Sequence, residues 1–132
     1  MLQPFWTVLV IEDDDATREA TAEALSLAQF AVFTARSLNG ACNLLRSFPG
    51  RCLVLLDLHL NGEDGREVLD FLGTLPDSAR RFPVIVVSAD SDVESLRRYP
   101  FVIDVVAKPV EATALLRRVI EHAQLTSSER SG

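Results

Sequence analysis

The segment from Cys52 to Asp57 constrains the fold more than any other part of the chain. Its first five residues carry little polarity and lead directly into a carboxylate, with Gly50 before the segment and Asn61-Gly62 after it as turn formers. A continuous apolar run of this length predicts a strand buried on both faces, which is typical of a parallel sheet covered by helices. Ligands bind such sheets at the carboxyl ends of the strands. The sequence therefore predicts that Asp57 lies where an open α/β fold carries out its chemistry.

Apolar segments alternate with amphipathic ones along the whole chain. Strict alternation predicts an α/β protein with a doubly wound parallel sheet, here a flavodoxin-like (βα)5 fold with five strands in the order 2-1-3-4-5. Besides the strand at 52–57, we expect strands at 8–11, 31–35, 83–88 and 102–106, and helices at about 16–27, 38–48, 65–74, 92–98 and 112–123.

The 132 residues suffice for one domain with a proper core, and they show no internal repeat or linker. We expect a single domain over 1–132, with its core at about 7–125 and a polar, frayed tail at 126–132. Asp15 is the expected N-cap of the first helix. A polar connection is expected after Leu75, and His122 is expected to be exposed on the last helix.

Charge and cysteine content exclude several classes of function. A net charge of −6 argues against direct binding to nucleic acid or membranes, which usually requires a basic patch. Cys42 and Cys52 have neither zinc-site nor disulfide-framework spacing, so we expect small core residues in a reducing cytosol. The chain start lacks the features of a secretory signal, and no apolar stretch reaches membrane-spanning length, so we expect a cytoplasmic protein.

Four of the five expected strands end in a functional group. In the expected strand order these ends meet at one crevice. Clustered carboxylates repel one another unless a cation neutralises them, and Mg²⁺ (or Mn²⁺) suits such oxygen ligands. A carboxylate can also attack a phosphoryl group to form an aspartyl phosphate, while a hydroxyl and the only lysine of the chain would bind phosphoryl oxygens. The groups are Glu12-Asp13, Asp57, Ser88 and Lys108.

At these residues the chain resembles the receiver domains of two-component response regulators, over about residues 7 to 125. Each motif is weak alone, but all of them occur in order and at compatible spacings. They are Val8 to Asp13 for the first strand and acidic pair, Leu55-Leu56-Asp57 for the phosphoacceptor strand, Asp64-Gly65 for the following turn, Val86 to Ala89 for the hydroxyl-bearing strand end, and Lys108-Pro109.

The resemblance implies a phosphorylation switch rather than an enzyme. Asp57 would accept a phosphoryl group from a histidine kinase, a histidine phosphotransfer protein or a small donor, with Mg²⁺ required. Asp13 would bind the metal directly, Glu12 partly through water, and His59 through its backbone carbonyl. Ser88 and Lys108 would hold the phosphoryl oxygens. The signal would then pass to a downstream protein partner or effector domain.

The resemblance also implies roles for neighbouring positions, and some of them depart from the family pattern. His59 and Asp90 stand at the two positions that tune hydrolysis of the phosphate, and we expect them to set its lifetime. Ser88 and Val105 occupy the switch positions, but the second is usually aromatic in the family. Asn61 stands where the family usually has proline, and the helix after Ser88 looks abbreviated.

Two other functions remain open from the sequence. A receiver-like module that binds proteins without phosphorylation is favoured by Val105 and Asn61, whereas the complete set of strand-end groups argues against it. A phosphohydrolase of the haloacid dehalogenase type also uses an aspartate nucleophile, but it requires a second acid where this chain has His59, and the chain has no room for a cap domain. The absence of both a P-loop and G-x-G-x-x-G argues against a nucleotide-binding domain.

Overall fold

The computed structural model describes the backbone of residues 7–131 and the side chains of residues 7–123. A five-stranded parallel sheet forms its centre, in the order β2-β1-β3-β6-β7. In the main sheet β6 and β7 are the fourth and fifth strands along the chain, so this order is 2-1-3-4-5. It confirms the predicted doubly wound fold. The strands are β1 (Thr7–Ile11), β2 (Ala31–Ala35), β3 (Leu53–Asp57), β6 (Val84–Ser88) and β7 (Val102–Ala107).

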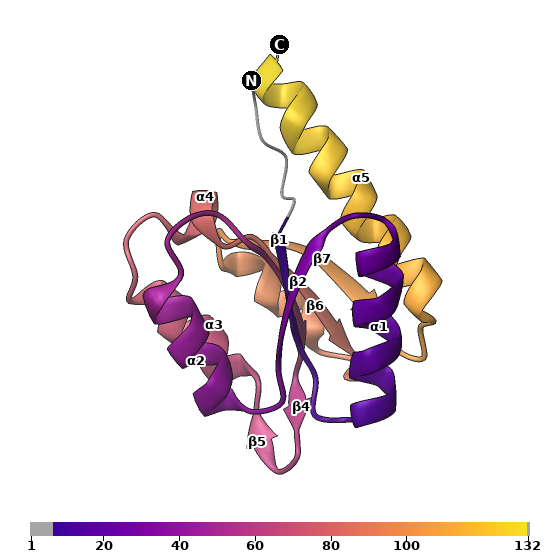
Figure 1. Cartoon of the computed structure of the whole chain (residues 1–132). Helices are drawn as coiled ribbons and strands as arrows, with labels where there is room; N and C mark the ends of the chain where they lie inside the picture. Colours follow the sequence, from indigo (N-terminus) through magenta and orange to yellow (C-terminus); the bar gives the residue numbers. More distant parts are fainter. Residues whose placement is uncertain (1–6, 132) are drawn as a thin grey trace.

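Helices cover both faces of the sheet (Figure 1). One face packs against α1 (Asp15–Leu27) and α5 (Ala112–Ser131), and the other packs against α2 (Leu38–Ser47) and α3 (Arg66–Gly73). The short 3-10 helix η1 (Val93–Arg98) lies on the same side as α2 and α3. Its single short stretch confirms that the helix after Ser88 is abbreviated.

The central strand explains the apolar run that dominates the sequence. All five residues of β3 are buried. Val54 and Leu56 contact the α2–α3 side, while Leu53 and Leu55 contact the α1–α5 side. Because both faces of β3 are covered, its side chains are apolar on either face. The one polar residue of the strand, Asp57, stands at its end.

The start of the first helix differs from expectation. The N-cap of α1 is Asp14, not Asp15, because an Asp14 carboxylate oxygen accepts hydrogen bonds from the amide and hydroxyl of Thr17 at 2.9 and 2.6 Å. Asp15 instead lies in the first turn, where its carboxylate pairs with Arg18. An acid in the first turn is favourable beside the helix N-terminus, so both positions suit the same sequence.

The end of the chain and the connection after α3 also differ from expectation. The sequence predicts a polar, frayed tail at 126–132, whereas the backbone of α5 continues as a helix to Ser131. The connection after Leu75 contains a one-turn helix, α4 (Ser78–Arg81), which is too short to show a periodic apolar pattern. No helix in the described part of the chain has the length and apolarity needed to cross a membrane.

A small hairpin follows β3 along the chain and lies at the lower end of the molecule in Figure 1. It pairs β4 (His59–Leu60) with β5 (Glu63–Asp64), and its two turn residues, Asn61 and Gly62, have positive φ values of 49° and 88°. Such a turn favours Asn-Gly, and proline cannot adopt a positive φ. The departure at Asn61 therefore gives this loop a different shape from one that holds a proline.

Candidate functional site

Three carboxylates meet at the carboxyl edge of the sheet. Glu12 and Asp13 directly follow β1, and Asp57 ends β3, which pairs with β1 in parallel register. One oxygen of each carboxylate lies within 4.8 Å of the others. Glu12 and Asp57 are buried, at 7% and 4% exposure, so solvent screens the charges of their carboxylates poorly.

Lys108 offsets part of this negative charge. Its Nζ lies 2.8 Å from an Asp57 oxygen and 3.9 Å from a Glu12 oxygen. Burial would lower the pKa of Lys108, but the hydrogen bond and charge of Asp57 outweigh it and raise the pKa. Burial raises the pKa of Glu12 to about 7, with the adjacent Asp57 carboxyl adding to the effect. One lysine thus leaves the three acids short of positive charge.

The donor set fits a hard divalent cation. Carboxylate oxygens are the ligands that Mg²⁺ prefers, and the ion usually binds to one or two carboxylates together with waters and phosphate oxygens. Glu12, Asp13 and Asp57 offer such oxygens within one small volume. A divalent cation would also add positive charge to a pocket in which three carboxylates face one lysine.

The Asp57 carboxylate is held in a fixed orientation. One oxygen accepts the backbone N–H of His59 at 3.0 Å, and the other accepts the Lys108 ammonium at 2.8 Å. The carboxylate lines a cavity of about 230 Å³ that extends beside Thr17 and Thr21 of α1 and Leu115 near the start of α5. It is therefore buried by its neighbours yet open to a reacting group.

Gly65 allows the chain to pass close to Asp57. A Cβ at this position would lie 2.5 Å from the Asp57 carbonyl oxygen and 2.8 Å from the Leu58 Cα, which backbone atoms cannot accommodate without shifting. The Gly65 N–H also donates to the Leu58 carbonyl at 2.6 Å. The close approach of the start of α3 to the end of β3 thus requires glycine at position 65.

Ser88 ends β6 beside the same edge. It is 1% exposed, and its hydroxyl accepts the backbone N–H of Asp90 at 3.0 Å. Its carbonyl accepts the Lys108 N–H at 3.0 Å, which ties the residue after β7 to the end of β6. The structure therefore brings the ends of β1, β3, β6 and β7 together, as the strand order predicts.

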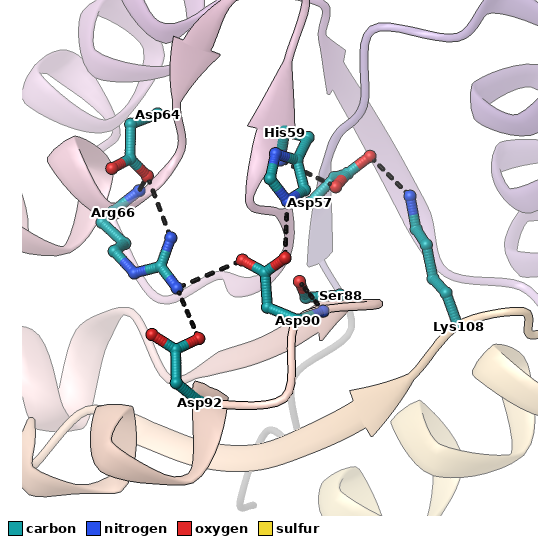
Figure 2. Close-up of polar contacts among 8 residues, drawn as sticks. All are labelled: Asp57, His59, Asp64, Arg66, Ser88, Asp90, Asp92 and Lys108. Atoms are coloured by element: carbon teal, nitrogen blue, oxygen red, sulfur yellow. Dashed lines mark hydrogen bonds and ion pairs between the residues drawn. The ribbon is translucent and has the colours of Figure 1, made fainter.

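A polar network that the sequence did not predict borders the site (Figure 2). His59 Nε2 lies 2.9 Å from an Asp90 oxygen, and the other Asp90 oxygen lies 3.2 Å from Arg66. The bond to His59, then the one to Arg66, lowers the pKa of Asp90, and Asp90 raises the pKa of His59. Arg66 follows Asp64-Gly65 directly, but no motif or periodicity distinguishes it from the other eleven arginines.

A second polar cluster lies away from this edge. Asp104 of β7 is 8% exposed and bonds to Arg118 and, at 2.9 Å, to His122 of α5. Burial would raise the pKa of Asp104, but these bonds lower it. The expectation of an exposed His122 is therefore wrong. Arg118 and His122 are four residues apart, so they share a helix face, and a polar residue inside an apolar strand was the available signal.

Val105, next to this cluster, is half-buried. Its side chain packs against the apolar cluster on the η1 side of the sheet, and its N–H donates to Asp104 at 2.8 Å. Valine has no long side chain that can move between a buried and an exposed position. Val105 therefore cannot act as an aromatic residue would at this position.

A parallel sheet with an acidic pocket and an opposed lysine at its carboxyl edge defines a class of α/β protein, and comparison with known proteins identifies the family. Residues 8–120 match the family described as "Response regulator receiver domain". The chain is 34% identical to the response regulator protein FleR of Pseudomonas aeruginosa over 131 residues, which cover 95% of this chain and 26% of FleR. It is 35% identical to a cyclic di-GMP phosphodiesterase of Thermotoga maritima, covering 89% and 30% of the two chains.

Solved structures show the same fold. The signal receiver domain of a Luxo repressor protein from Vibrio parahaemolyticus superposes with a TM-score of 0.78 at 22% identity, covering 98% of this chain and 96% of that one. A CheY-like receiver domain protein from Methanospirillum hungatei has a TM-score of 0.71 at 24% identity, covering 92% and 97%. The chain belongs to the receiver domain family of two-component response regulators. It spans less than a third of the curated relatives named above.

Proposed function

We propose that Asp57 accepts a phosphoryl group and that this modification switches the protein contacts of the domain. The observation that carries the proposal is the buried Asp57 carboxylate, held between an acidic pair and Lys108 at 2.8 Å on the edge of the sheet. A structural ion pair would need only the lysine and one acid. The surplus of acids is what a site for a cation and a phosphoryl group requires.

The residues of the chain divide the work of phosphoryl transfer. Glu12, Asp13 and Asp57, with the backbone carbonyl of His59, would hold Mg²⁺ or Mn²⁺, which offsets the charge of the transferring group when bound. An Asp57 oxygen forms a bond to phosphorus while the bond to the donor nitrogen or oxygen breaks, and the donor keeps that electron pair. The Lys108 ammonium would give up its bond to the Asp57 carboxylate and donate to a phosphoryl oxygen instead. The Ser88 hydroxyl would donate to another phosphoryl oxygen.

Partners follow from this role. The donor would be a phosphohistidine of a histidine kinase or of a histidine phosphotransfer protein, and the receiver of the signal a downstream protein or an effector domain, in the cytoplasm. The domain itself would contact neither nucleic acid nor membrane. Ser88 and Val105 would form the switch positions, and because Val105 is half-buried and short, the signal would leave by a route other than aromatic rotation.

Intact-mass spectrometry tests the proposal. After incubation with Mg²⁺ and acetyl phosphate, the wild type should gain one phosphoryl group, which Asp57→Asn and a sample with EDTA should lack. If the phosphoryl group is hydrolysed too fast to be detected, NMR can instead monitor the binding of beryllofluoride to the site. If neither adduct forms on the wild type, the proposal is wrong.

A phosphorylation-independent binding module is the second candidate, and Val105 is the observation that favours it. This function predicts that Asp57→Asn binds the downstream partner as well as the wild type does, with or without acetyl phosphate.

A further inference from the structure

Arg66 is shared by three carboxylates from two loops beside the site (Figure 2). Its guanidinium lies 3.4 Å from Asp64, 3.2 Å from Asp90 and 3.3 Å from Asp92. Among the side chains that the structure describes, no other arginine or lysine forms an ion pair with any of these three acids. Arg66, on the first turn of α3, thus links the loop after β3 to the loop after β6.

The middle acid of the three belongs to a chain of bonds between two residues of the site. Asp57 accepts the His59 N–H at 3.0 Å, and the Ser88 hydroxyl accepts the Asp90 N–H at 3.0 Å. The His59 ring and the Asp90 carboxylate join at 2.9 Å. Bonds therefore run from Asp57 through His59 and Asp90 to Ser88, across the space between the ends of β3 and β6.

The charge of Arg66 is what allows Asp90 to stay in this position. Asp90 and Asp92 lie two residues apart and close to Asp64 through their shared partner, so without a cation these carboxylates repel one another. Repulsion would drive the loop after β6 toward solvent, where Asp92 is already 76% exposed. Asp90 would then separate from His59.

We infer that Arg66 is a positioning residue that keeps the His59–Asp90 bond closed across the site and thereby slows loss of the phosphoryl group. The inference rests on the proposed function of Asp57. In hydrolysis a water oxygen bonds to phosphorus, the bond from phosphorus to the Asp57 oxygen breaks, and the carboxylate keeps the electron pair while the water proton passes to solvent. A closed His59–Asp90 bond narrows the path of that water.

The test measures phosphoryl lifetime in the whole chain. Wild type, Arg66→Met and Arg66→Lys are phosphorylated with acetyl phosphate and Mg²⁺, the donor is removed, and the decay of the adduct is followed by intact mass. We expect Arg66→Met to lose its phosphoryl group roughly two- to fivefold faster, the size expected for a partly exposed ion pair. Arg66→Lys should fall between the two, because a lysine keeps the charge but not the fork that reaches several acids.

A second comparison separates positioning from a general structural effect. In an Asp90→Ala background, Arg66→Met should no longer change the decay, because the residue through which Arg66 acts is gone. Arg80→Met is the matched control: Arg80 pairs with Asp77 at 3.4 Å near the other end of β3, so the same change of charge should leave the decay unchanged.

Each outcome decides the question. Unchanged or slower decay in Arg66→Met, or equal acceleration with and without Asp90, overturns the role of Arg66 while leaving phosphorylation of Asp57 intact. If the wild type forms no adduct at all, the proposed function itself fails and the role of Arg66 fails with it.

Discussion

Two buried aspartates on different strands of the same sheet have opposite surroundings. Asp57, 4% exposed, faces two further acids and one lysine. Asp104, 8% exposed, faces Arg118 and His122, with Arg97 at 4.0 Å. Both form short bonds to cations, so distance alone does not distinguish them.

The balance of charge does distinguish them. Around Asp104 the cations are sufficient, and the pKa of the carboxyl is lowered as in an ordinary structural ion pair. Around Asp57 the negative charge is in surplus, and its neighbour Glu12 has a pKa raised to about 7. A buried acid with satisfied charge stabilises the fold, whereas repulsion within a group of acids with surplus charge stores free energy that a bound cation can release.

The strongest test of this comparison is a pair of asparagine variants. Asp104→Asn should lower the free energy of unfolding by about 2 kcal/mol, because it removes the negative charge that its charged partners face and replaces one acceptor oxygen with an NH₂ donor. Asp57→Asn, measured without metal, should change it by less than about 1 kcal/mol, and upward, because a repelling charge is removed. Urea unfolding at pH 7 in EDTA measures both. Equal destabilisation by the two variants would contradict the distinction.

Acid sharpens the Asp104 side of the comparison. A lowered folded pKa gives stability that is fully present above the ordinary value of 3.8 and is lost as pH falls through the folded pKa. The difference between wild type and Asp104→Asn should therefore persist at pH 5 and shrink below 3.8. A difference that stays constant down to pH 2.5 would show that the effect is one of packing.

Magnesium should stabilise the protein through the carboxylates around Asp57 and not through the Asp104 cluster. A ligand that binds only the folded state stabilises it by about 1.4 kcal/mol at ten times its dissociation constant. We therefore expect added Mg²⁺ to raise the stability of wild type and of Asp104→Asn by the same amount, and to have little effect on Asp13→Asn. Thermal unfolding with and without EDTA measures the shift. Stabilisation of Asp13→Asn equal to that of wild type would place the ion elsewhere.

Glu12 predicts a pH dependence of the opposite sign to that of Asp104. Its carboxyl ionises near 4.5 in the unfolded chain and near 7 in the folded one, so the folded state binds more protons in this window and its stability falls as pH rises. Without metal, Glu12→Gln should therefore become more stable relative to wild type between pH 4.5 and 7, by about 1 kcal/mol after allowance for solvent screening. Parallel stability curves for the two proteins would refute the raised pKa.

The two regions also differ in how far the sequence predicts them. The edge at Asp57 is predictable because parallel strands bring their carboxyl ends together, so unbroken apolar runs that end in polar groups locate the site. The sheet order and the grouping of Glu12, Asp13, Asp57 and Lys108 follow from that rule.

Arg66 and the Asp104 cluster escape the same reasoning for physical reasons. An arginine reaches several ångströms on a flexible stem, so its partners depend on loop positions that strand and helix patterns do not determine. Asp104 lies within an apolar strand and pairs with a helix far along the chain, and an irregularity between Val84 and Ile85 in the β6–β7 register changes which positions face α5. The sequence predicts a turn at Asn61-Gly62, but the two strands of the hairpin have only two residues each, which is too short to show an alternating pattern.

The smallest expected effects come from substitutions of the arginines around Asp104. They test whether the nearby positive charge is enough to balance the Asp104 carboxylate. Arg118 is 42% exposed and Arg97 is 46% exposed at 4.0 Å, so each ion pair is screened by water. Arg118→Met should cost about 0.5–1 kcal/mol and Arg97→Met less than about 0.5 kcal/mol, as for exposed pairs, since His122 still bonds to the carboxylate. Loss of both should exceed the sum of the single losses, because Asp104 would then rely on His122 alone and approach the uncompensated state of the acids around Asp57. Urea unfolding of the two single variants and the double variant measures this coupling, and strict additivity would mean that the two arginines act independently of each other.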